Sequence, residues 1–473
     1  MPRSLRLAEP GPADPVRHRR SMSSAVALGV GQRRFDALDA FLFVIYLLGL
    51  YLGVALMITP TIPLTCAPSG FAGLALLWRR RNDMRPKEIA GLLLVVALFV
   101  GSILSAENLT FLDKRFTGLL QLTYSLVIGY AIFLTMVHGD RDRIASILLA
   151  FCLTIIVGCL LEEYGGLRTI SDTVREHIYN ARVVYDADLR DEILYGRVRP
   201  KLFTSEPSAV TFAYTHFSSV WLVLSRSRFK YPIFAGLLGL ALIVLPGPTL
   251  MLMLLLAIPY LVLLSGGPGR ASASRLIGAT AVSAVVLAIA VVLGQSVFAE
   301  RLHQLQSGQD ASFFYRFTGP MLVAFDMLHT HPWAGSGLTG EQYIADRVMT
   351  VFNNSAQFQS AWRIPKVSDV LTNYFWTHWI YLGVIWGTIT VIGLSWWLRV
   401  LGTTSVLYCW AVWAILGQAS GSYVGPKTWA VLLIAAASTV LVAQPDKRDG
   451  NPYPAPQPHP LFTRRYSRLA GPT

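Results

Sequence analysis

The feature that most constrains this chain is its alternation of long apolar runs with short charged links. A helix needs about 20 apolar residues to cross the hydrocarbon core of a bilayer, and runs close to that length recur along most of the sequence. Of the 473 residues, 53% are hydrophobic and only 14% are charged, whereas a soluble domain carries about 25% charged residues. The sequence therefore predicts an all-α polytopic membrane protein and excludes a soluble globular one.

We expect about 12 transmembrane helices within a membrane domain at 37–443. Pro63 and Pro68 interrupt the second span, and Pro246-Gly-Pro248 predicts a tight turn between the seventh and eighth. Membrane helices tolerate such residues where neighbouring groups satisfy the backbone. The predicted spans are 37–58, 62–78, 89–106, 116–138, 144–164, 206–225, 231–246, 248–265, 276–295, 377–398, 402–423 and 426–443.

The basic residues predict the orientation of the chain. They gather in every second link and in both tails, so a twelve-span topology places all of these clusters in the cytoplasm, as the positive-inside rule requires. The net charge of +13 is then an orientation signal rather than a nucleic-acid site. The clusters hold Arg17, Arg19, Arg20, Arg33, Arg34, Arg79, Arg80, Arg81, Arg85, Lys87, Arg141, Arg143, Arg226, Arg228, Lys230, Arg270, Arg275, Arg399, Lys447 and Arg448.

Both tails are accordingly expected on the cytoplasmic side of a bacterial inner membrane. Residues 1–36 form a basic N-terminal tail without a cleavable signal peptide, because the first apolar run is long enough to span. Residues 444–473 are rich in proline and predict an extended, disordered tail.

The opposite, periplasmic face receives two long segments, 165–205 and 296–376, the larger lying between the ninth and tenth spans. Ile170, Val174 and Ile178 recur at near-helical spacing in the first segment, which predicts an amphipathic helix at the membrane interface. Loops of this length in a compact protein are usually functional.

The sequence gives little indication of a metal or a disulfide framework. His329 and His331 have no carboxylate beside them, and Asp186 and Asp188 lie in a charged stretch typical of a solvated helix face. We therefore expect neither metal nor cofactor. The cysteines lie inside apolar runs and are interpreted as small core residues: Cys66, Cys152, Cys159 and Cys409.

The first cluster that could carry chemistry lies just before the sixth span, from Arg199 to Ser208. Glu206 followed by Pro207 suits a helix start, where the helix dipole favours a carboxylate, and this alone would explain its presence. Together with Arg199 and Lys201, the same carboxylate would instead orient a hydroxyl nucleophile beside two cations that hold a pyrophosphate.

Two further clusters lie before and at the start of the tenth span. Arg316 precedes a helix pattern beginning at Pro320, and the turn at Gly335-Ser-Gly337 would let backbone amides approach an anion, although a plain loop helix ending at a glycine turn explains it too. Asn373 and His378 enter the tenth span among aromatic residues. They are typical of an interfacial belt, or else of a sugar site with His378 as proton shuttle.

In order, spacing and sidedness these segments resemble the O-antigen polymerase and ligase superfamily, which includes exopolysaccharide repeat-unit polymerases. The resemblance covers about residues 195–400. It rests on Arg199 with Ser205-Glu-Pro-Ser208, on Arg316 followed by Pro332-Trp-Ala-Gly335-Ser-Gly337, and on Asn373 before Leu382-Gly383. Ligases of the superfamily tend to carry a histidine directly before the position matching Asn373. This chain has Thr372 there, which favours a polymerase over a ligase.

The resemblance implies a membrane glycosyltransferase fold of the GT-C-like type, acting without metal. Two undecaprenyl-pyrophosphate-linked oligosaccharides would meet at the periplasmic face, and the growing chain would be transferred from its lipid to the new unit. Arg199 and Arg316 would hold the pyrophosphate and Glu206 would act on the acceptor hydroxyl. The expected substrate-binding residues are Lys201, Ser208, Gly335, Gly337, Asn373 and His378.

Two alternatives remain open from the sequence. One is a ligase that transfers the glycan to lipid A core or to protein, and the other is a flippase or transporter for lipid-linked glycans. Ion-coupled transporters usually need charged residues inside the membrane, and the predicted spans hold almost none, which favours an enzyme. A flippase and a chain-length regulator are the expected partner proteins.

Overall fold

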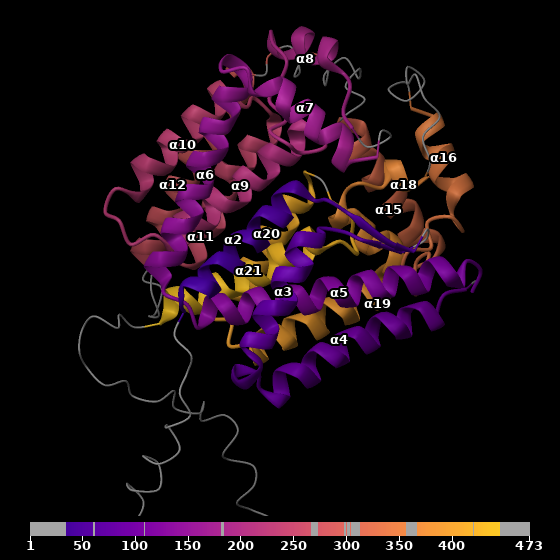
Figure 1. Cartoon of the computed structure of the whole chain (residues 1–473). Helices are drawn as coiled ribbons and strands as arrows, with labels where there is room; N and C mark the ends of the chain where they lie inside the picture. Colours follow the sequence, from indigo (N-terminus) through magenta and orange to yellow (C-terminus); the bar gives the residue numbers. More distant parts are fainter. Residues whose placement is uncertain are drawn as a thin grey trace, which may run out of the picture.

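The computed structural model describes residues 35–59, 62–107, 109–180, 184–265, 273–297, 299, 303, 313–355, 367–419 and 421–444. The fold is an α-helical bundle with one two-stranded sheet (Figure 1). The predicted tails lie outside the described residues, apart from Phe35, Asp36 and Gln444, as does much of the segment between the ninth and tenth predicted spans.

Five helices in the described part of the chain are long and apolar enough to cross a membrane. They are α4 (Pro86–Leu104), α5 (Leu112–Val137), α6 (Arg141–Tyr164), α19 (Tyr374–Val400) and α21 (Pro426–Ala443). The other predicted spans also contain helices: α2 (Ala37–Leu52), α3 (Ala67–Arg79), α9 (Pro207–Leu224), α10 (Lys230–Val244), α11 (Met251–Leu263), α12 (Ala273–Val297) and α20 (Val406–Gly417). The chain is therefore an all-α protein of the membrane type.

The boundary between the first two predicted spans was wrong. Gly53, at φ 70°, ends α2 by donating its N–H to Gly49 O at 2.9 Å. The chain then forms an antiparallel hairpin of β1 (Leu56–Thr59) and β2 (Ile62–Leu64) before α3 begins. Apolar residues alone suggested continued helix, but Gly53 permits a left-handed C-cap that turns the chain out of it.

Close helix pairs build the core where small residues meet large ones. Gly129 of α5 faces Leu433 of α21, and a Cβ on Gly129 would lie 2.7 Å from the Leu433 side chain. Gly91 of α4 meets Trp397 of α19 in the same way, at 2.4 Å. Small residues let membrane helices approach closely. Figure 1 shows α4 at the bottom of the view, packed against both α19 and α5.

Basic links meet at one end of the bundle, called here the basic end. Arg79, at the end of α3, contacts Asp36 before α2 at 2.7 Å, and Arg143 of α6 donates to Phe35 O at 3.3 Å. The neighbouring links there carry Arg80, Arg81, Arg85, Arg141 and Arg226. Their gathering agrees with the predicted alternation, while the side of the membrane that they face stays a prediction.

The two long segments lie at the opposite end. The first forms α7 (Leu167–Ile178) and α8 (Asp188–Tyr195), so the predicted helix through Ile170 and Ile178 is confirmed. The Tyr179 hydroxyl, just after α7, donates to Leu52 O at the end of α2 at 2.7 Å. The second segment forms η4 (Phe314–Thr318), α15 (Gly319–Thr330), α16 (Ala345–Asn353) and α18 (Val367–Val370). Figure 1 shows α7 and α8 above the bundle and α15, α16 and α18 beside them.

Candidate functional site

The residues before α9 form a tight turn that buried polar groups hold in place. Leu202 and Phe203 both have positive φ, 34° and 63°. Such non-glycine backbone costs about 1–3 kcal/mol per residue and persists only where its surroundings determine it. The Glu162 carboxylate accepts the N–H groups of Lys201 (3.0 Å) and Leu202, and Ser171 Oγ accepts that of Phe203 (3.0 Å).

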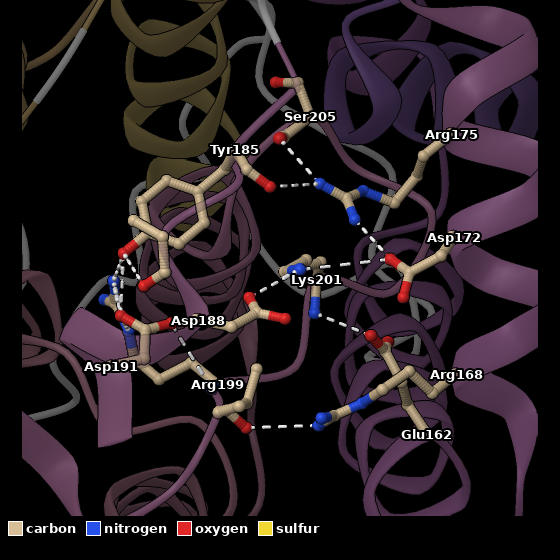
Figure 2. Close-up of polar contacts among 12 residues, drawn as sticks. Glu162, Arg168, Asp172, Arg175, Tyr185, Asp188, Asp191, Arg199, Lys201 and Ser205 are labelled. Carbon is tan, nitrogen blue, oxygen red and sulfur yellow. Dashed lines mark hydrogen bonds and ion pairs between the residues drawn. The ribbon is translucent and has the colours of Figure 1, made fainter. Parts of the chain in front are cut away.

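Arg175 of α7 is buried beside this turn, with only 2% of the residue exposed (Figure 2). Its guanidinium donates to the carbonyl oxygens of Thr204 (2.7 Å), Ser205 (3.1 Å) and Tyr185 (3.3 Å), and it forms an ion pair with Asp172. Arg175 thus binds two carbonyls immediately before α9 and joins them to the carbonyl of Tyr185 before α8.

Lys201, predicted to bind pyrophosphate, is engaged in the same network. Its ammonium lies 2.8 Å from Asp188 and 3.9 Å from Asp172, and its side chain is 6% exposed (Figure 2). It does not line the pocket described next. In this structure Lys201 is held by ion pairs with two partly exposed carboxylates instead of presenting a charge to a ligand.

Glu206, Ser208 and Arg316 meet in a pocket at the opposite end from the basic links. Arg316 Nη2 lies 3.4 Å from Glu206 Oε2 and 3.2 Å from Ser208 Oγ, and the Ser208 hydroxyl donates to the other carboxylate oxygen. Glu206 occupies the N-cap position of α9 without bonding to its amides. Glu206 therefore lies at the helix start, as the simpler interpretation expected, but its oxygens contact Arg316 and Ser208 and not the helix amides.

Local structure explains where Arg316 lies. It belongs to η4, a π-helical turn that leads into α15, and Pro320 occupies the first turn of α15 as predicted. A π-helical turn inserts an extra residue per turn and often marks a functional site. The side chains of Arg316 and Glu206 are 29% and 33% exposed, so both can be reached from solvent.

Arg199 lines the same pocket but has its own partner. Its guanidinium lies 2.8 Å from Asp191 Oδ1, and it packs over the rings of Tyr195 and Tyr185 at 4.6 and 5.9 Å. Burial opposes the charge of Arg199, but Tyr195, Asp191 and Tyr185 together raise its pKa. Burial and the hydrogen bond to Asp191 raise the pKa of Tyr185 to about 12, so that hydroxyl stays protonated at neutral pH.

The pocket is positively charged and small. Arg190, Arg199 and Arg316 line it against one carboxylate, Glu206. Asp191 forms an ion pair with Arg199, and the predominance of arginine among the lining side chains suits an anion. The free space is about 30 Å³, so a diphosphate would have to displace side chains at the mouth. The wall facing α9 consists of Gly247, Pro248 and Thr249, at the predicted turn.

The glycine turn has a structural role in this conformation. α19 is broken at Gly383, where φ is 63°, and the loop at 332–335 fills the break. A Cβ on Gly335 would lie 2.3 Å from Ile380 O, and one on Gly337 would lie 2.0 Å from the Arg115 guanidinium. Neither glycine lines the Glu206 pocket or the second pocket described below. Both positions require glycine because a larger residue would clash with the backbone at Gly335 and with Arg115 at Gly337.

Asn373 connects the Arg316 turn to the start of α19. Its side-chain oxygen caps α19 by accepting the N–H groups of Phe375 (3.0 Å) and Trp376 (3.2 Å). Its amide nitrogen donates to Arg316 O (2.8 Å) and to Gln418 (2.9 Å). Asn373 is fully buried, so it positions Arg316 without facing a ligand in this structure.

His378 also lies within the bundle. Its ring contacts the Tyr423 hydroxyl at 2.9 Å and Gly387 O at 3.2 Å, and the residue is 2% exposed. It lines neither of the two pockets. The hydrogen bonds show a satisfied core histidine in this conformation, where a sugar contact was predicted.

A second pocket, which sequence reasoning missed, lies between the starts of α5 and α19 and has a volume of about 420 Å³. Lys114 and Glu341 form an ion pair at 2.6 Å on its wall. The sequence contained one indication: Lys114 and Arg115 stand between the third and fourth predicted spans, where the positive-inside rule disfavours basic residues.

The described residues contain no group of three or more His, Cys, Asp or Glu side chains able to hold a metal ion. Asp188 is paired with Lys201, and His331 lies 3.2 Å from Glu107. All four cysteines are buried and unpaired, as predicted for core residues.

Comparison of this chain with protein-family models and with curated proteins finds no match in either.

Proposed function

We propose that this chain is a membrane glycosyltransferase that polymerises undecaprenyl-pyrophosphate-linked oligosaccharide repeat units into O-antigen or exopolysaccharide. In this proposal it crosses the bacterial inner membrane about 12 times with a GT-C-like arrangement. The basic end faces the cytoplasm and the Glu206 pocket faces the periplasm.

The observation that carries the proposal is the meeting of Arg316 with Glu206 and Ser208. Arg316 and Glu206 are 110 residues apart in sequence, one in the second long segment and the other directly after the first, yet their side chains lie 3.4 Å apart. They combine an anion-binding cation and a carboxylate base in one solvent-accessible pocket. Transfer between two phosphate-linked glycans needs both groups together.

The proposed step is a displacement at the anomeric carbon of the growing chain. An acceptor hydroxyl oxygen forms the new glycosidic bond while the bond to the lipid diphosphate breaks. The hydroxyl proton passes to Glu206, and the electron pair leaves with the diphosphate, whose charge Arg316 and Arg199 stabilise. Positioned charges of this kind are usually the largest contribution to catalysis.

The partly exposed ion pair between Arg316 and Glu206 suits repeated binding and release of a diphosphate. Arg316 and Glu206 are each about one-third exposed, and exposed ion pairs contribute only about 0–1 kcal/mol. A diphosphate would replace the carboxylate as the partner of Arg316 at little cost. Glu206 would then be released from its cation and able to accept the proton.

Deletion of the gene distinguishes the polymerase from its alternatives. We expect loss of long glycan chains while single repeat units are still attached to their final acceptor. Accumulation of lipid-linked polymer with no attachment would indicate a ligase instead. Repeat units trapped on the cytoplasmic leaflet would indicate a flippase.

The Glu206→Gln variant is expected to lower the rate of chain growth by about 10²–10⁴-fold, because it removes the base but preserves shape and hydrogen bonding. The rate is measured with purified protein in vesicles and extracted lipid-linked units. Glu176→Gln, on an exposed position of α7 at the same end, is the matched control and should retain wild-type activity. Full activity in the Glu206 variant would remove this carboxylate from the mechanism.

Cysteine labelling tests the sidedness. In a background whose four buried cysteines are replaced by alanine, a membrane-impermeant maleimide should label Thr350→Cys in intact spheroplasts. Lys87→Cys should react only after permeabilisation. Both positions are exposed, at α16 and at the basic end of α4. The reverse labelling pattern would place the Glu206 pocket in the cytoplasm and exclude a periplasmic polymerase.

A further inference from the structure

The second pocket has the dimensions of a ligand site. Its volume of about 420 Å³ falls within the roughly 300–1,000 Å³ typical of small-molecule sites. Its lining joins the starts of α5 and α19 to the turn before α21. The residues that matter for its chemistry are Lys114, Gln121, Glu341, Thr372, Tyr381 and Tyr423.

The charges on its wall cancel. Glu341 Oε1 lies 2.6 Å from the Lys114 ammonium, and Oε2 accepts a hydrogen bond from the Tyr381 hydroxyl at 2.9 Å. The Glu341 side chain is 7% exposed and that of Lys114 is 33% exposed. The pair therefore offers a carboxylate edge and an ammonium to a ligand without net charge, unlike the arginine-rich Glu206 pocket.

Thr372 supplies an independent indication of a ligand. Its hydroxyl oxygen is buried on the pocket wall and has no hydrogen-bond partner in the described part of the chain. A buried hydroxyl without a partner costs about 1–3 kcal/mol, so a ligand hydroxyl that supplies one would bind favourably. The Gln121 side chain and two tyrosine rings complete a neutral, polar and aromatic lining suited to sugar residues.

The two pockets have no described lining residue in common, but hydrogen bonds connect their walls. Thr372 faces the second pocket, and the adjacent Asn373 donates to the carbonyl of Arg316, which lines the first. Thr339, also on the second pocket, donates to Lys114 O at 3.2 Å and ties the Arg316 segment to α5. Asn373 and Thr339 therefore link the wall of the second pocket to the segment that carries Arg316.

We propose that the second pocket binds uncharged sugar residues of the acceptor unit, and so positions its hydroxyl toward Glu206. The assignment rests on the proposed function for the identity of the acceptor. The pocket itself recognises any neutral glycan whose hydroxyls match Glu341, Lys114 and Thr372.

The test uses the full chain in nanodiscs with lipid-free oligosaccharides of one to three repeat units, released by mild acid from the lipid-linked pool. Binding is measured by calorimetry. Glu341→Gln should weaken it by at least about tenfold, the loss expected when a hydrogen bond to a charged group is removed. Thr117→Trp, which fills the pocket from α5 and leaves Lys114 and Glu341 unsubstituted, should abolish it.

Two controls separate this proposal from the proposed function. Gln342→Ala, exposed beside Glu341 but outside the pocket, and Arg316→Ala should both bind lipid-free oligosaccharide like the wild type. Wild-type binding in both Glu341→Gln and Thr117→Trp, or no binding by the wild type at millimolar concentration, would overturn the second-pocket proposal alone. Normal chain growth by Arg316→Ala would overturn the polymerase mechanism and leave the binding result intact.

Discussion

Arg316→Ala is expected to abolish chain growth, with a fall in rate of at least about 10²–10³-fold, the usual loss when one charge-stabilising donor is removed. Arg316 is the cation closest to Glu206, and the other pocket arginine with a resolved ion pair, Arg199, is already held by Asp191. The measurement is the length distribution of glycan in a deletion strain complemented with the variant, at matched membrane levels.

Two variants sharpen this result. Arg347→Ala removes an exposed arginine of α16 that forms an ion pair with Asp326 at 3.3 Å, and it should leave glycan length unchanged. Arg316→Lys retains the charge but loses the two-pronged geometry that suits a diphosphate, so we expect it to remain strongly impaired. Long glycan chains in cells carrying Arg316→Ala would show that this arginine does not hold the leaving group.

The helices were largely predictable because each is a long apolar run with an evident boundary. α4 begins at Pro86 after a basic link, and α6 begins after Asp140, whose side chain accepts the N–H of Asp142. The hairpin at 56–64 was not predicted, because Leu56 and Met57 look like membrane residues. A hydropathy pattern shows that these residues are apolar, but it does not show that the helix ends at Gly53.

The site was predictable only in part, for a physical reason. Glu206, Ser208, Arg199 and Arg316 stand near helix starts, where sequence patterns place residues well, and the structure brings all four into one pocket. Lys201 instead forms an ion pair with Asp188, outside the pocket. Asp188 lies 13 residues earlier, in a stretch whose sequence is typical of a solvated helix face. The sequence shows a charge, but only the fold shows which opposite charge neutralises it.

Arg175 shows the same limit more strongly. In sequence it is one basic residue on an amphipathic helix, typical of a solvated face. In the structure it is buried and binds two carbonyl oxygens of the turn before α9, those of Thr204 and Ser205, and that of Tyr185 before α8. A long-range role of this kind leaves no local pattern, because its partners are backbone atoms that any residue could provide.

Arg175→Ala is accordingly expected to lower chain growth by about 10²-fold or more, although Arg175 lies outside the pocket, since a misplacement of about 1 Å in a catalytic group can cost that much. The substitution leaves the carbonyls of Thr204, Ser205 and Tyr185 without the guanidinium, while Asp172 keeps the Lys201 ammonium at 3.9 Å. A buried polar group left without its partner costs about 1–3 kcal/mol. The left-handed backbone at Leu202 and Phe203 would then relax and carry Glu206 away from Arg316.

The expected fault is local, because the bundle is held by helix contacts that do not involve α7. Limited proteolysis should therefore show faster cleavage within 165–205 while the membrane helices remain protected. Glu176→Ala is the matched control on the same helix, since Glu176 is exposed, and its loss should change neither cleavage nor glycan length. If Arg175→Ala produced wild-type glycan with unchanged proteolysis, the position of Glu206 would be determined by α9 alone, and the buried network of Figure 2 would have no part in the reaction.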